Sequence, residues 1–214
     1  MSQLDTEIYN TLNKAKLLGL EVKEITTHCL NRCYLVSISK AEHILLIPSN
    51  VTEIHDPEYS NKMGFVNPLD KYKGTLKVIG GQNLISTKNL FKQVKFSTID
   101  ISKLDTYNVI DMSRMFYCYF NNKSKCKILG LNRINTSKVE YMNSMFTNCL
   151  VEDLDLSNFS TNNVKTMAFM FSGCDCDTLN LNSFNISENC DIYAIFDYFD
   201  CINLITSSKI LKQE

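Results

Sequence analysis

The stretch LDLSNFSTNNVKTMAFMFSGC at residues 154–174 decides the fold of this chain, because the sequence repeats it in register. Its block MAFMF at 167–171 has counterparts in MNSMF at 142–146 and MSRMF at 112–116. The phenylalanine that ends each block recurs every 25 residues, with one spacing of 30, at Phe91, Phe116, Phe146, Phe171 and Phe196. A fixed period of this length indicates one unit stacked on copies of itself, since a single copy cannot bury its apolar face.

Each copy is predicted to contain one strand and one short helix. Apolar residues alternate at 99–101 and at 154–156, which is typical of a strand. A threonine follows three residues before a valine, at Thr106, Thr136 and Thr161. Apolar residues then recur at i, i+3, i+6 and i+7 between 164 and 171, which predicts a short capped helix with one buried face. The expected fold is an α+β solenoid of four to five strand and short-helix repeats.

The segments 154–174 and 99–118 (IDISKLDTYNVIDMSRMFYC) resemble the BspA-type leucine-rich repeat. The consensus of that repeat runs close to Leu-Asp-Leu-Ser-x-Phe-Asp-Thr-Ser-x-Val-x-x-Met-x-x-Met-Phe. The resemblance covers about residues 96–206, with degraded copies at 76–94 and 179–199. It implies a leucine-rich-repeat solenoid, and members of the family are commonly large secreted or surface proteins with adhesive roles. Solenoids serve many unrelated binding roles, so the resemblance is more specific for fold than for function.

Residues 1–73 do not carry the repeat and are predicted to form an α+β cap on the solenoid at 74–214. Apolar residues lie on one helical face between 4 and 18, and Gly19 would end that helix. Alternating apolar segments at 20–29, 33–39 and 43–48 indicate hairpin strands. The expected role of the cap is to cover the open apolar end of the repeat stack.

The sequence predicts a cytoplasmic protein of a bacterial or phage-infected cell. Its first residues lack the basic and apolar regions of a signal peptide, and no 18 apolar residues run together. The nine cysteines are therefore expected to be free thiols, with Cys126, Cys176 and Cys201 as small core residues of successive repeats. A metal site at His28-Cys29-x-x-x-Cys33 is an alternative that lacks a second ligand pair, so no metal is expected.

No cofactor and no enzymatic activity are expected either. The three histidines have no nucleophile or carboxylate at a recognisable spacing, and the glycines at 80–81 lack the Lys-Ser/Thr of a phosphate loop. With 22 basic and 23 acidic side chains, the chain offers no broad charged surface for nucleic acid or an anionic membrane. Asp100, Asp153 and Asp155 should line the outward strand face, but too sparsely to favour mimicry of nucleic acid. The same register places Ile128 outward and Leu129 inward.

Exposed aromatic residues are the candidate binding residues. Three lie on the predicted helix face where sibling repeats carry small or polar residues, and three lie at or in the five-residue insertion after Phe116. These candidates are Tyr141, Phe169 and Tyr193, and Tyr117, Tyr119 and Phe120. Aromatic side chains on a surface are frequent interface anchors. The alternative is that they pack under the insertion or against the cap, or are isolated exposed residues with no role.

These observations favour a non-enzymatic module that binds a protein or ribonucleoprotein by covering one of its surfaces. Short members of the repeat family without signals resemble accessory products of phages and mobile elements, which suggests an inhibitor of a host defence complex of the anti-CRISPR type. A surface adhesin exported by an unrecognised route is the alternative, and an enzyme with its site in the cap is a third hypothesis. Little sequence follows the strand at 201–206, so a homodimer through that edge is a further expectation.

Overall fold

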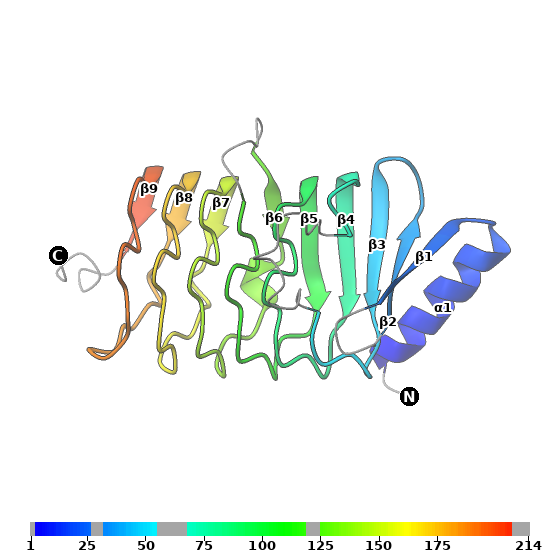
Figure 1. Ribbon diagram of the computed structural model, residues 1–214, viewed down its shortest axis with the longest axis horizontal. Helices are drawn as coiled ribbons and strands as arrows, with labels where there is room; N and C mark the ends of the chain where they lie inside the picture. Colours follow the sequence, from blue (N-terminus) through cyan, green and yellow to red (C-terminus); the bar gives the residue numbers. More distant parts are fainter. Residues whose placement is uncertain (1–2, 27–31, 55–67, 119–124, 207–214) are drawn as a thin grey trace, which may run out of the picture.

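A computed structural model shows a β-solenoid of about five turns with one helix at the N-terminal end (Figure 1). The structure describes residues 3–26, 32–54, 68–118 and 125–206. The strands lie side by side along the solenoid axis, and the termini lie at opposite ends of the stack (Figure 1). The predicted fold class, a solenoid with an N-terminal α+β cap, is confirmed.

The cap consists of helix α1 (Gln3–Leu17) and three antiparallel strands, β1 (Glu21–Thr26), β2 (Arg32–Ser37) and β3 (Glu42–Ile47). Gly19 follows the helix with a φ of 65°, a left-handed conformation that suits glycine at a helix end. The apolar face of α1 packs Ile8 and Ala15 against Val36 and Leu46 of the sheet. The helix and the hairpin strands therefore form where apolar periodicity predicted them.

The sheet of the cap continues into the repeats without a gap. Strand β3 pairs in parallel with β4 (Lys73–Gly80), which pairs with β5 (Lys95–Leu104), and β5 pairs with β6 (Lys127–Leu129). The result is one six-stranded sheet, β1 to β6. A second sheet holds the parallel strands β7 (Leu150–Asp155), β8 (Asp175–Asn180) and β9 (Asp200–Ile205). The predicted boundary at residue 73 falls at the start of β4, and two separate domains stay a prediction.

The predicted short helices are wrong. In the described residues the Met-x-x-Met-Phe blocks form tight turns, because the residue before the second methionine has a left-handed φ, 55° at Arg114, 57° at Ser144 and 58° at Phe169. A helix cannot continue through this conformation. We call each complete turn of the solenoid a coil. The backbone amides of the blocks bond to the next coil, as where the Phe116 N–H donates to the Met145 carbonyl at 3.0 Å. The two long sides of each coil are therefore both held by hydrogen bonds between coils.

The repeated threonines join neighbouring coils rather than cap helices. The buried Thr136 hydroxyl donates to the Ser160 carbonyl at 3.1 Å and accepts from the Ser160 N–H at 2.8 Å. Thr106 makes the same two bonds to Asn135, and Thr161 makes them to Asn185. Each hydroxyl thus satisfies both backbone groups of one residue in the next coil, where no strand pairing does so.

The core is a column of stacked rings and methionines, as the repeat predicts. The rings of Phe91, Phe116, Phe146, Phe171 and Phe196 stack with centroid separations of 5.3 to 5.8 Å between neighbours. This phenylalanine stack runs through all the coils. Repeat methionines such as Met115, Met145 and Met170 are fully buried beside it. The methionines and the final phenylalanine of each block are therefore structural, whereas Phe169, in the middle of the block at 167–171, is exposed and stays a candidate.

Candidate protein-binding surfaces

The structure brings two of the predicted aromatic residues together and separates the others. Phe169 and Tyr193 lie edge to face in neighbouring coils, with centroids 5.3 Å apart, and are 39% and 71% exposed. Tyr141 lies apart from them, beside the ammonium of Lys165. Tyr117 is half-buried, and Tyr119 and Phe120 lie outside the described residues. Their roles in binding stay predictions.

A shallow groove of about 780 Å³ crosses four coils on the side where the repeats make their tight turns. Each coil contributes two outward residues that are two positions apart, so the repeat itself builds the groove. The lining residues are Asn83, Ile85, Asn108, Ile110, Lys138, Glu140, Asn163 and Lys165. This volume is within the range of small-molecule sites in proteins. Sequence reasoning missed the groove, although these residues align in two columns of the repeat.

The groove is apolar at one end and charged at the other. Ile85 and Ile110 are exposed in the two coils nearer the cap. In the next two coils, the Lys165 ammonium lies 2.6 Å from a Glu140 carboxylate oxygen, and this hydrogen bond raises the pKa of Lys165. The Lys138 ammonium lies 4.1 Å from the centroid of the Tyr107 ring and donates to the Asn108 side-chain oxygen at 2.9 Å. Within the described residues, Lys138 makes no ion pair with a carboxylate.

Asparagine side chains hold the floor of the groove in place. The Asn83 amide donates to the Ser49 carbonyl at 2.7 Å, and the Asn163 amide donates to the Ser137 carbonyl at 2.6 Å. The Asn108 amide bonds in the same way to the Gln82 carbonyl. Each bond ties one coil to the coil before it, so the groove is largely formed before a ligand arrives.

On the strand face of the solenoid, the predicted register of β6 is wrong. Strand β6 pairs Ile128 with Ile99, which turns Ile128 inward at 9% exposed and Leu129 outward at 39%. Gly130 then adopts a φ of 89°, and Leu131 returns to the core. One extra residue therefore separates the two inward side chains, Ile128 and Leu131. Only glycine fits at position 130, because an added Cβ would collide with the backbone of Ser102.

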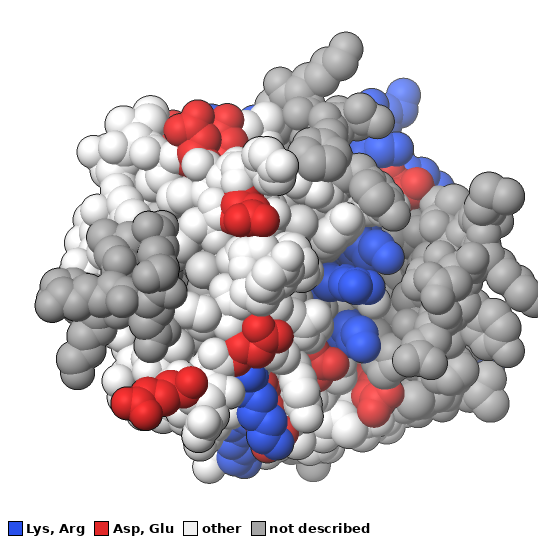
Figure 2. Space-filling model, turned by 60° about the vertical axis from the view of Figure 1, so that its left-hand side comes forward, with Lys and Arg blue, Asp and Glu red and all other residues white. Residues whose placement is uncertain are grey.

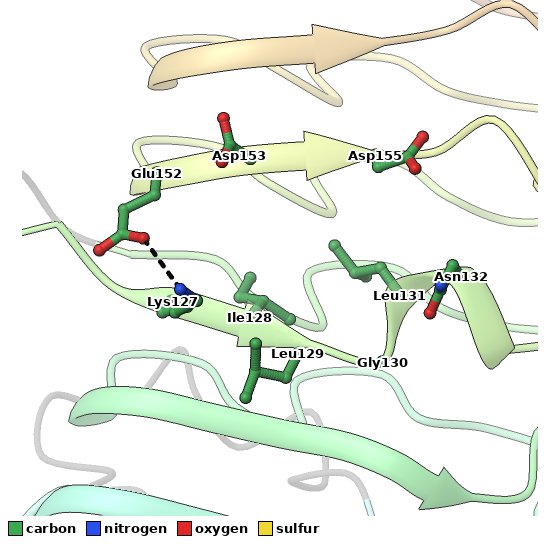
Figure 3. Close-up of a pocket in the computed structure, with 9 residues that line it drawn as sticks. All are labelled: Lys127, Ile128, Leu129, Gly130, Leu131, Asn132, Glu152, Asp153 and Asp155. Atoms are coloured by element: carbon green, nitrogen blue, oxygen red, sulfur yellow. Dashed lines mark ion pairs between the residues drawn. The ribbon is translucent and has the colours of Figure 1, made fainter.

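This register change opens a notch between β6 and β7, lined in part by Leu129, Asp153 and Asp155 (Figure 3). The two strands are joined by a bridge between Cys126 and Val151, and the sheet ends beyond it. The notch has a volume of about 220 Å³, and an ion pair of 3.6 Å between Lys127 and Glu152 lies at the bridged end (Figure 3). The notch is too small for a folded segment and can admit one side chain.

The described cysteines are free, and the inner ones are kept protonated. Burial raises the pKa of Cys33 and of Cys126 to about 12. The pKa of Cys149 is raised first by its hydrogen bond with Cys118 and then by burial. A thiol needs its thiolate form to react or to bind a metal, so these side chains act as core residues. Cys29 and the histidine before it lie outside the described residues, and the described residues hold no group of three metal-ligating side chains.

The surface near the C-terminal end is mostly uncharged, with a few acidic side chains (Figure 2). Strand β9 pairs with β8 on one side, and its residues Ile202, Leu204 and Ile205 are exposed. No helix among the described residues is long and apolar enough to span a membrane.

A family model described as "Mycoplasma protein of unknown function, DUF285" matches residues 85–208, which is more than half of the chain. The matched part begins in the first repeat and ends just after β9, and it is consistent with the BspA-type repeat. No curated protein matches the chain, and no solved structure matches it.

Proposed function

Given that the chain belongs to the family of Mycoplasma proteins of unknown function DUF285, we propose that it is a non-enzymatic protein-binding module. The observation that carries the proposal is the groove over four coils, with exposed Ile85 and Ile110 at one end and lysines beside Tyr107 and Tyr141 at the other. Exposed aliphatic side chains next to tyrosines and a few charges are the composition of a protein interface.

The charges in the groove support a protein partner over a nucleic acid. Of its three charged lining residues, Lys165 is paired with Glu140, which leaves Lys138 as the one cation of the lining that makes no ion pair within the part of the chain that the structure describes. Nucleic-acid binding usually needs several lysines or arginines on successive phosphates. The exposed pair Phe169 and Tyr193 supports a protein partner too, because aromatic side chains anchor many such interfaces.

The groove can be tested by co-purification from the native host with two matched variants. Ile85→Asp combined with Ile110→Asp places charge on the apolar end, and Ile38→Asp changes an isoleucine of similar exposure in the cap. We expect the same partner to be recovered with wild type and with Ile38→Asp, and to be lost with the double variant. A partner retained by the double variant would show that the groove is not the binding site.

Two finer hypotheses differ in where the protein acts. In the first, it is a cytoplasmic inhibitor of a host defence complex, of the anti-CRISPR type and encoded by a mobile element. In the second, it is an adhesin on the cell surface. Both rest on resemblance to other repeat proteins, and fractionation of native cells separates them: recovery on the cell exterior would overturn the first.

A second copy of the chain is a separate candidate partner, at β9. This strand exposes Ile202 and Leu204, and the segment 201–206 carries no charged residue of the kind that protects edge strands from pairing. Ile202→Lys should then convert a dimer into a monomer in light scattering. A wild-type protein that is monomeric at all concentrations would remove this candidate.

A further inference from the structure

The side chains that line the groove restrict which partner segments it can bind. The inference drawn from them rests on the proposed function, that the groove is a protein-binding site. Its charged end has one unpaired group, because the Lys165 ammonium is 2.6 Å from Glu140 whereas Lys138 has no carboxylate partner among the described residues. Tyr107 holds the Lys138 ammonium over its ring, which orients the charge without neutralising it. Lys138 therefore presents a fixed, exposed positive charge.

The apolar end fixes the second requirement. Ile85 and Ile110 occupy the same repeat position in adjacent coils, and the Ile110 N–H donates to the Ile85 carbonyl at 2.8 Å. Their side chains therefore lie next to each other and form one aliphatic patch. An aliphatic side chain of a ligand would cover both at once, whereas a charged one would lose its hydration there.

The spacing of the two ends fits an extended peptide. Lys138 belongs to the third coil of the groove, but its ammonium reaches back to the Asn108 side-chain oxygen and the Tyr107 ring, in the coil of Ile110. Asn108 and Ile110 line the groove two residues apart, so the ammonium lies ~7 Å from the isoleucine patch. In an extended segment, residues i and i+2 point to the same side and are also ~7 Å apart. One peptide can therefore meet both ends with two side chains that are two residues apart.

We propose that the groove binds an extended segment of a partner protein that lays an aliphatic side chain on Ile85 and Ile110 and a carboxylate, two residues away, against Lys138. The four coils are spanned by ~14 Å, whereas the motif from i to i+2 spans ~7 Å, so the motif occupies about half of the groove. The floor is already fixed by the asparagine bonds between coils, which lowers the ordering cost of binding such a short segment.

Four hexapeptides test the proposal against the full chain in NMR titrations. Two carry the motif in either chain direction, Gly-Leu-Ser-Glu-Ser-Gly and Gly-Glu-Ser-Leu-Ser-Gly, and in the other two lysine replaces glutamate. We expect one glutamate peptide to bind wild type at least tenfold more tightly than its lysine counterpart. Lys138→Glu should reverse that preference, since it exchanges the charge that the peptide meets.

Lys40→Glu is the matched control, because it makes the same change in net charge at an exposed lysine of the cap. It should leave the preference for glutamate unchanged. Lys138→Gln, which removes the charge without reversing it, should abolish the preference and guards against misfolding of the first variant. Equal binding of glutamate and lysine peptides, or no binding of any, would overturn this inference. Whether the groove is a binding site at all would still be decided separately, by whether Ile85→Asp combined with Ile110→Asp loses the native partner.

Discussion

Thr136→Val tests whether the threonine hydroxyls join the coils. Valine has nearly the shape of threonine, so the change removes the hydroxyl and leaves no cavity. It deletes the bond donated to the Ser160 carbonyl and the bond accepted from the Ser160 N–H, of 3.1 and 2.8 Å. Two such bonds contribute about 2 kcal/mol, and an amide left without its partner in the interior costs about 1 kcal/mol more. We expect the free energy of unfolding to fall by about 3 kcal/mol.

Equilibrium unfolding in urea, followed by far-UV circular dichroism, measures this loss. Ser137→Ala is the control, because it removes the adjacent hydroxyl, whose bond to the Asn135 side chain lies at the surface. That control should lie within about 0.5 kcal/mol of wild type. An unchanged urea m-value would show that the variant alters stability and not the extent of unfolding. If Thr136→Val also stays within about 0.5 kcal/mol of wild type, the hydroxyls do not join the coils.

Three further variants have expected outcomes in the same urea assay. Tyr198→Asn should raise stability by about 0.5–1 kcal/mol, because Tyr198 has a φ of 54° and is 93% exposed, so asparagine relieves strain and loses no burial; a loss of stability would show that the ring makes a needed contact. Gly130→Ala should cost about 2–4 kcal/mol through its left-handed φ and its contact with the backbone of Ser102, and near-wild-type stability would contradict the β6 register. Burial raises the pKa of the Cys33 thiol from 9.0 to about 12, so the thiol ionises at a lower pH in the unfolded chain than in the folded protein. The stability that the buried thiol contributes is complete below pH 9 and is lost between pH 9 and 12. From pH 8 to 10, Cys33→Val should therefore lose about 1.4 kcal/mol less than wild type, and equal losses would refute the assignment.

The sequence predicted the core because the core follows the period. Val139, Met142 and Phe146 recur in every full copy, and a residue that recurs at each coil must face its own copies across the stack. The turns were missed because their left-handed positions carry Arg114, Ser144 and Phe169, none of which is glycine. Without that signal, apolar residues three and four apart fit a helix equally well.

The register of β6 could not be chosen from alternation. Ile128 and Leu129 are both apolar, so either can face inward, and the deciding residue is Gly130 two positions later. The binding surface has a different difficulty. Phe169 and Tyr193 are 24 residues apart, one less than the period, so their contact is diagonal and is not found by comparing equivalent positions.

The interruption between β6 and β7 has a mechanical consequence. On the strand side the two sheets separate, while on the other side Tyr141 still bridges to Thr166, and the Phe146 and Phe171 rings remain stacked. Because the coils of β6 and β7 are held mainly on one side, we expect the solenoid to bend most easily there, so that the first and last coils tilt about the line between β6 and β7. The groove crosses the same line, with Glu140 on one side and Lys165 on the other. The proposed contacts Ile85, Ile110 and Lys138 all lie on the cap side of this line, so only a bound segment long enough to reach Lys165 would restrain the tilt.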